Sequence, residues 1–171
     1  MYGLFKIIRI ENGFLIRLEP STLELFLSNI NKYKVFFKCE IKEEDNIFAF
    51  AYVPLEGDTS QLPQQTNHLT NIDSTFISCT SHTLSLFEIW THDLNLEQQT
   101  TNLSIDTWFA FESKLGIPEL YSSTQDSFIL QYLNLQELGA VSFKKGCYTG
   151  QEIIARMKFL GKLKKKMYLL T

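Results

Sequence analysis

Two short apolar runs separated by an Asn-Gly pair open the chain and determine its first element. Residues 4–10 (LFKIIRI) and 14–18 (FLIRL) flank Asn12 and Gly13. Asparagine and glycine tolerate the positive φ angles of a two-residue turn, so the two runs are predicted to pair as an antiparallel hairpin. The chain is therefore predicted to begin with a pair of antiparallel strands.

Three later segments have the apolar spacing of helices. Residues 23–30 place four apolar side chains on one helical face. Residues 104–115 form a second amphipathic segment, which Gly116 and Pro118 should end. Residues 150–159 form the third predicted helix.

Strand patterns account for much of the remaining chain. Residues 35–42 alternate apolar and charged side chains, which predicts a strand with Cys39 packed as an inert thiol on its buried face. Residues 55–74 are rich in Gly, Pro, Ser, Thr, Asn and Gln, which is typical of a loop or domain connection. The further predicted strands are residues 47–53, 76–79, 84–90 and 164–170.

These elements predict an α+β fold in which helices pack against antiparallel sheets. We expect one small α+β subdomain over residues 1–55 and a second over residues 56–143, followed by residues 144–171. The 171 residues are 44% hydrophobic and 20% charged, which is a globular composition. No apolar run reaches the roughly 18 residues that span a membrane, so no membrane partner is predicted.

The three cysteines, Cys39, Cys79 and Cys147, are far apart and odd in number. A disulfide framework is therefore not expected, and a reducing, cytoplasmic location is predicted. The cysteines lack the paired spacing of a zinc site, and the three histidines share no common spacing. No metal site is predicted.

Charge is unevenly distributed along the chain. Residues 144–171 hold eight basic side chains against Glu152 alone, a net charge of +7, whereas residues 1–143 hold 8 basic and 18 acidic side chains, a net charge of −10. A basic segment of this kind can meet nucleic acid, phosphate or a polyglutamate tail. A solvated surface without a partner is the alternative, and the sequence leaves both open.

The run of residues 144–152 (KKGCYTGQE) gives Cys147 an unusual setting. The adjacent Lys145 and the amino terminus of the helix that begins near Gly150 both favour a thiolate. The glycines on either side, Gly146 and Gly150, let other atoms approach the sulfur. Cys147 with Lys145 is therefore the candidate catalytic pair, and a tight turn around a small buried thiol is the alternative.

Three neighbours of Cys147 can bind a ligand. Tyr148 offers a flat ring and a phenol, and Gln151 and Glu152 offer a carbonyl and a carboxylate in the first helical turn. No histidine lies near Cys147 in sequence, so a hydrolase triad is not favoured. No glycine-rich loop has the spacing of a nucleotide-binding motif. For Trp108, the helical periodicity alone favours core packing.

Residues 134–143 (NLQELGAVSF), the KKGCYTGQE run and Ala155-Arg156 together resemble the signature of the YgfZ family. These are folate-binding proteins related to the T-protein, the aminomethyltransferase of the glycine cleavage system. The Lys-Gly-Cys-Tyr-x-Gly-Gln-Glu core is long and specific. The resemblance extends through the chain, including residues 3–42 and 108–118.

The resemblance implies tetrahydrofolate as the cofactor, bound within a ring-like arrangement of three domains. It also implies iron–sulfur enzymes as partners, whose synthesis or repair the family supports, including an enzyme of tRNA methylthiolation. Cys147 matches the cysteine that the family needs for activity, and Lys145 matches the lysine of its motif. Trp108 matches a tryptophan that contacts folate, which reverses the core-packing interpretation. The implied cofactor-binding residues are Trp108, Lys145, Tyr148, Gln151 and Glu152.

Full-length members have a further N-terminal segment with another folate-contacting tryptophan and a C-terminal β-barrel, so the resemblance implies an incomplete T-protein-like chain that stops in the first barrel strand. It favours an accessory folate-binding factor over a classical enzyme. The T-protein relatives have an acidic-aromatic pair where this chain has Cys147-Tyr148, which argues against aminomethyl transfer. A tetrahydrofolate-dependent one-carbon transferase and a non-enzymatic RNA-binding module, with tRNA contacts through basic residues 144–166, are the alternatives.

Overall fold

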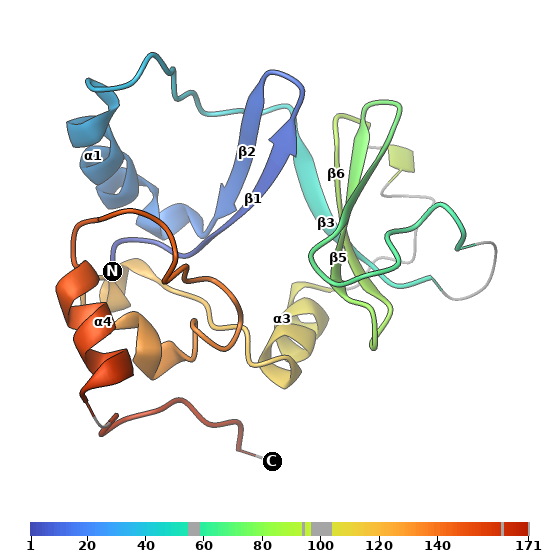
Figure 1. Cartoon of the computed structure of the whole chain (residues 1–171). Coiled ribbons are helices and arrows are strands. Elements are labelled where there is room, and N and C mark those ends of the chain that lie inside the picture. Colours follow the sequence, from blue (N-terminus) through green and yellow to red (C-terminus); the bar gives the residue numbers. More distant parts are fainter. Residues whose placement is uncertain (55–58, 94, 97–103, 162, 171) are drawn as a thin grey trace. The chain divides into compact units, whose positions relative to one another are not determined.

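The protein is described from a computed structural model, which covers residues 1–54, 59–93, 95–96, 104–161 and 163–170 (Figure 1). Its contacts divide the chain into two compact units. Unit 1 comprises Met1–Cys39 and Glu112–Thr171, and unit 2 comprises Glu40–Phe111. The predicted boundary between residues 55 and 56 lies outside the described residues, and the separation of residues 144–171 as a region of its own stays a prediction. No helix in the described part of the chain is long and apolar enough to cross a membrane.

The predicted hairpin at the start of unit 1 is confirmed. Strands β1 (Phe5–Ile10) and β2 (Gly13–Leu18) pair antiparallel, with Ile7 opposite Ile16. Within β1 only Ile8 is buried, whereas Phe5 and Ile7 are exposed, as is Ile16 in β2. The ribbon therefore keeps apolar side chains at the surface.

The helix predicted after the hairpin is confirmed as α1 (Leu23–Lys34), which follows the short 3-10 helix η1 (Pro20–Thr22) and buries Phe26. The strand predicted at residues 35–42 is wrong. The amide of Phe36 donates to the Tyr33 carbonyl (3.0 Å) and that of Phe37 to the Lys34 carbonyl (2.9 Å), so the chain leaves α1 through turns. Cys39 was predicted to be buried on this strand, and it is exposed instead, on a segment that does not pair with a sheet.

Helix α4 (Gln151–Phe159) confirms the third predicted helix, and two 3-10 helices, η2 (Ser122–Thr124) and η3 (Leu130–Leu133), precede it. The buried Gln131 side chain donates to the Ile154 carbonyl (2.8 Å) and so fixes α4 against η3. Residues 163–170 do not form the predicted strand. Their backbone is held at Met167, whose amide donates to the Tyr132 carbonyl (2.9 Å).

Unit 2 contains an antiparallel four-stranded sheet in the order β3-β6-β5-β4. All six residues of the inner strand β6 are buried, and Ile77, Cys79, Phe87 and Ile89 form a core on one face. The expectation that residues 55–74 are all loop is wrong, because β4 lies within them. The strands are β3 (Phe48–Tyr52), β4 (Leu69–Ile72), β5 (Thr75–Ser81) and β6 (Leu86–Thr91).

The second predicted helix is confirmed as α3 (Ile105–Lys114). The Ser104 hydroxyl accepts the Thr107 amide (3.2 Å), and Gly116 takes the left-handed conformation (φ 69°) that ends the helix. Helices and antiparallel sheets together confirm the α+β class, and the T-protein-like arrangement stays a prediction.

Candidate functional site

The candidate site is the junction between α4 and the segment before it, residues 143–150, which we call the motif loop. Gly150 stands at the N-terminal cap of α4 in the left-handed region (φ 87°). Two hydrogen bonds close the junction: the Gln151 amide donates to the Tyr148 carbonyl (3.1 Å), and the Tyr148 amide donates to the Gln151 side-chain oxygen (3.3 Å). The glycine and the glutamine of the motif therefore set the path of the loop.

The other end of the motif loop is held by the last turn of α4. The rings of Phe143 and Phe159 meet edge to face, with centroids 6.2 Å apart. The Lys158 ammonium lies 4.0 Å from the centre of the Phe143 ring, a cation–π contact. Because both ends contact α4, the loop runs back along the helix, and the cysteine lies between two fixed points.

Cys147 is exposed on this loop. The alternative interpretation, a small buried thiol in a tight turn, is therefore wrong. The Lys145 ammonium lies 4.6 Å from the centre of the half-buried Tyr148 ring and is itself exposed. The structure thus brings Lys145 and Tyr148 into contact and leaves the Cys147 thiol accessible to another molecule.

One contact of the site could not be seen in the sequence. The Tyr33 hydroxyl, on the last turn of α1, lies 3.3 Å from the Thr149 hydroxyl. The two residues are 116 positions apart. Local periodicity places Tyr33 on a helix but gives no information on which loop it meets, because that depends on the packing of unit 1.

The predicted site residues fall in both units. Lys145, Tyr148, Gln151 and Glu152 lie with Cys147 at the α4 junction of unit 1. Trp108 lies on α3 in unit 2 and is 6% exposed. A folate contact by Trp108 stays a prediction.

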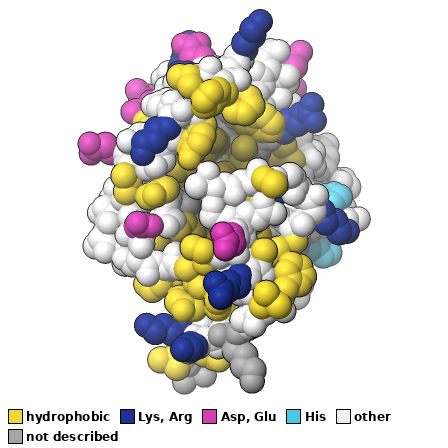
Figure 2. Space-filling model, turned by 60° about the vertical axis from the view of Figure 1, so that its left-hand side comes forward, with side chains coloured by type: hydrophobic (Ala, Val, Ile, Leu, Met, Phe, Trp, Pro, Cys, Tyr) yellow, Lys and Arg dark blue, Asp and Glu magenta, His cyan; other side chains and the backbone are white. Residues whose placement is uncertain are grey.

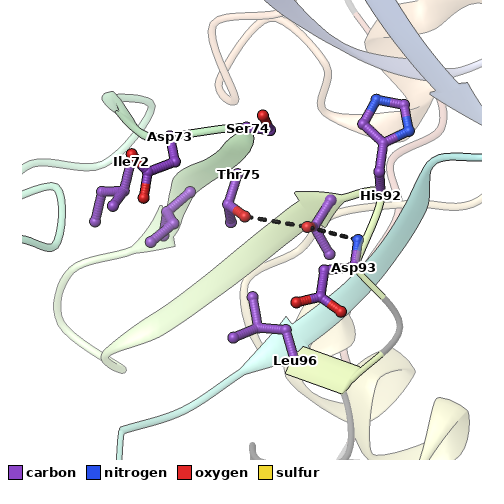
Figure 3. A pocket seen from close by; sticks show the side chains of 9 residues that line it. Ile72, Asp73, Ser74, Thr75, His92, Asp93 and Leu96 are labelled. Carbon is purple, nitrogen blue, oxygen red and sulfur yellow. Dashed lines mark hydrogen bonds between the residues drawn. The ribbon is translucent and has the colours of Figure 1, made fainter.

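Unit 2 has a separate cavity of ≈ 630 Å³ at the edge of its sheet (Figure 3). Ile72, Ile77 and Leu96 give it an apolar lining. The Thr75 and Thr91 hydroxyls lie 3.0 Å apart within it, and Thr91 also accepts the Asp93 amide (3.1 Å). The two threonine hydroxyls of the cavity are thus already paired with each other, and none of the predicted site residues lines it.

No protein-family model matches the chain. The chain is 32% identical over 184 aligned residues to the tRNA-modifying protein YgfZ of Escherichia coli O157:H7 (strain EC4115 / EHEC). This similarity covers 100% of the chain and 56% of the relative, so the chain spans a little more than half the length of the curated protein that it matches. The resemblance predicted from the KKGCYTGQE run is confirmed.

Proposed function

Since the chain belongs to the YgfZ family, we propose that it is a folate-binding accessory factor that supports iron–sulfur enzymes, including those of tRNA modification. The observation that carries this proposal is the exposed Cys147 on a loop that α4 holds at both ends. A fixed, accessible thiol suits a functional group better than a packing role. The fold proposed with this function is T-protein-like.

The residues at the α4 junction fit tetrahydrofolate by their chemistry. The cofactor has an anionic glutamate tail and a pterin ring with several N–H donors. Lys145 supplies an exposed cation for the tail, and Glu152 supplies an exposed carboxylate in the first turn of α4 for the donors. Gln151 already accepts the Tyr148 amide through its side-chain oxygen, so its amide group is what remains for a ligand.

Trp108 provides the direct test of folate binding. Replacing the second tryptophan, as in Trp90→Phe, leaves Trp108 as the one fluorophore of its kind. Titration of this variant with tetrahydrofolate should quench the emission with saturation. The same titration of Lys145→Ala and Glu152→Gln in that background should weaken binding, each by about tenfold for a lost charge-assisted contact. Absence of saturable quenching together with absence of heat in calorimetry would exclude the folate proposal.

Cys147 provides the test of the accessory role. In cells that lack their own YgfZ, the chain should restore methylthiolated tRNA, and Cys147→Ala should not. Cys39→Ala is the matched control, since Cys39 is also exposed but lies outside the motif. The competing function is one-carbon transfer from tetrahydrofolate. Formyl or methylene transfer that persists in Cys147→Ala would favour the transferase and refute the accessory role of the thiol.

A further inference from the structure

The two units carry opposite charges. Unit 1 holds 15 of the 16 basic side chains and 8 acidic ones, a net charge of +7, whereas unit 2 holds Lys42 and 11 acidic side chains, a net charge of −10. Outside residues 144–171, unit 1 has seven side chains of each sign. Its positive charge therefore comes entirely from the motif loop, α4 and the residues after them.

The basic side chains of this part of unit 1 are at the surface. Lys144, Lys145, Arg156 and Lys158 are exposed, as are Lys164, Lys165 and Lys166. The predicted patch also included Lys162, which lies outside the described residues. Figure 2 shows one face of the molecule, on which cationic and hydrophobic side chains lie next to one another.

Aromatic rings stand beside these cations. Phe159 is 69% exposed and Tyr168 is 75% exposed, so both rings are accessible to a base. Tyr168 follows the three lysines Lys164, Lys165 and Lys166 after one intervening residue, Met167. The backbone just before Tyr168 is held by two hydrogen bonds of Met167: its amide donates to the Tyr132 carbonyl (2.9 Å), and its carbonyl accepts the Asn134 side-chain amide (3.0 Å).

The type of cation distinguishes between two classes of partner. Of the 15 basic side chains in unit 1, 12 are lysines. Lysine is depleted in protein–protein interfaces, where arginine is enriched, but it is a common ligand of phosphate. Lysines next to exposed rings are the arrangement by which proteins bind single-stranded nucleic acid, with phosphates on the cations and bases stacked on the rings.

We propose that the surface formed by the motif loop, α4 and residues 163–168 binds single-stranded nucleic acid. Lys164, Lys165 and Lys166 contact consecutive phosphates, and an unpaired base stacks on Tyr168. The acidic unit 2 repels the same strand, so binding is confined to unit 1. The inference goes beyond folate binding and does not depend on it.

The test is titration of the 171-residue chain with a fluorescent 12-nucleotide uridine strand, without folate, at several salt concentrations. Changing Lys164, Lys165 and Lys166 together to Gln should weaken binding at least tenfold at low salt. It should also reduce the slope of log K against log salt by about 2, since each single-strand phosphate contact contributes roughly 0.7. Tyr168→Leu should weaken binding about tenfold and leave the slope unchanged, because it removes a ring and no charge.

Unit 2 supplies the matched controls. Lys42→Gln removes its one cation, and Phe48→Leu removes an exposed ring; neither change should alter the affinity. The affinities for a deoxyuridine strand and for a double-stranded oligonucleotide of the same length are measured as well. They show whether the surface distinguishes RNA from DNA and unpaired from paired bases. Equal affinity for polyglutamate and uridine strands, with no effect of Tyr168→Leu, would overturn the proposal in favour of an acidic protein partner or general anion binding.

Discussion

Strands β6 and β1 show how differently the two units are built. All six residues of β6 are buried, and the strand has a hydrogen-bonded neighbour on each side. In β1 only Ile8 is buried, and the strand has β2 as its neighbour in a two-stranded sheet. Since burial of apolar area is the main source of stability, unit 2 is expected to be the more stable part.

The candidate chemistry follows the opposite distribution. The exposed thiols, the motif loop and the excess of positive charge all belong to unit 1. Functional groups need access to solvent and partners, and a scaffold with few buried contacts can provide it. The comparison indicates that unit 2 contributes stability, whereas unit 1 holds the candidate reactive thiol and most of the candidate binding groups.

The largest contrast between the units should be in thiol reactivity. Cys39 and Cys147 of unit 1 are exposed, whereas Cys79 of unit 2 is 0% exposed. In a native-state reaction with Ellman's reagent, two thiols should react rapidly. Cys79 should react at least ~1000-fold more slowly, because its exposure requires opening of the sheet core.

The variant Cys147→Ala should leave one rapidly reacting thiol, and Cys39→Ala should do the same. Three rapid thiols would contradict the difference in burial between the units. Slow reaction of Cys39 would support the buried strand that the alternation at residues 35–42 predicted.

Matched isoleucine truncations should give the next largest effect. Ile89→Ala in β6 removes a side chain from the unit 2 core and should lower the free energy of unfolding by about 2–5 kcal/mol. Ile16→Ala in β2 affects a side chain that is 40% exposed and should cost less than about 1 kcal/mol. Urea unfolding followed by circular dichroism measures both, and equal losses would refute the proposed division of stability.

Much of the fold could be predicted from local pattern. The Asn-Gly hairpin, three helices and three strands of the unit 2 sheet follow from periodicity and turn residues. The prediction of a strand at residues 35–42 was wrong because alternation shows only which side chains could share a face. It does not show whether a neighbouring strand is there to pair with. Strand β4 was missed because Leu69-Thr70-Asn71-Ile72 has the polar composition of a loop, and its pairing with β5 compensates for weak propensity.

The candidate site also has features that could be predicted from the sequence and features that could not. Gly150 and Gln151 could be assigned to a helix start from sequence, since their roles are local. The contact between Tyr33 and Thr149, and the assignment of Trp108 and Cys147 to different units, depend on tertiary packing. Local spacing contains no information about either.

Two glycines of the motif loop offer a smaller and more local test. Gly150 has φ 87°, so Gly150→Ala should destabilise α4 by about 1 kcal/mol. Gly146 is the control: a Cβ there meets no atom within 4 Å, so Gly146→Ala should be neutral or slightly stabilising. Hydrogen exchange of the α4 amides should accelerate about fivefold in the first variant only. Equal exchange in both would show that the cap does not hold the loop.

The smallest expected effect concerns Glu119, whose carboxyl is partly buried, whereas most charged side chains of unit 1 are at the surface. Burial raises the pKa of Glu119 above its ordinary value, and the nearby Glu19 carboxylate adds to the rise. Two groups oppose it: the Leu120 amide, which donates to the Glu119 side chain (3.2 Å), and the Arg17 cation. The folded state therefore binds this proton more tightly than the unfolded state. The stability that this carboxyl contributes is present below the unfolded pKa and is lost as pH rises through the folded pKa. Glu119→Gln keeps the acceptor for Leu120 and removes the charge, so it should raise the melting temperature slightly at pH 7 and lose that advantage near pH 4. A variant that is less stable than the parent at pH 7 would mean that the attraction to Arg17 outweighs the desolvation of the carboxylate.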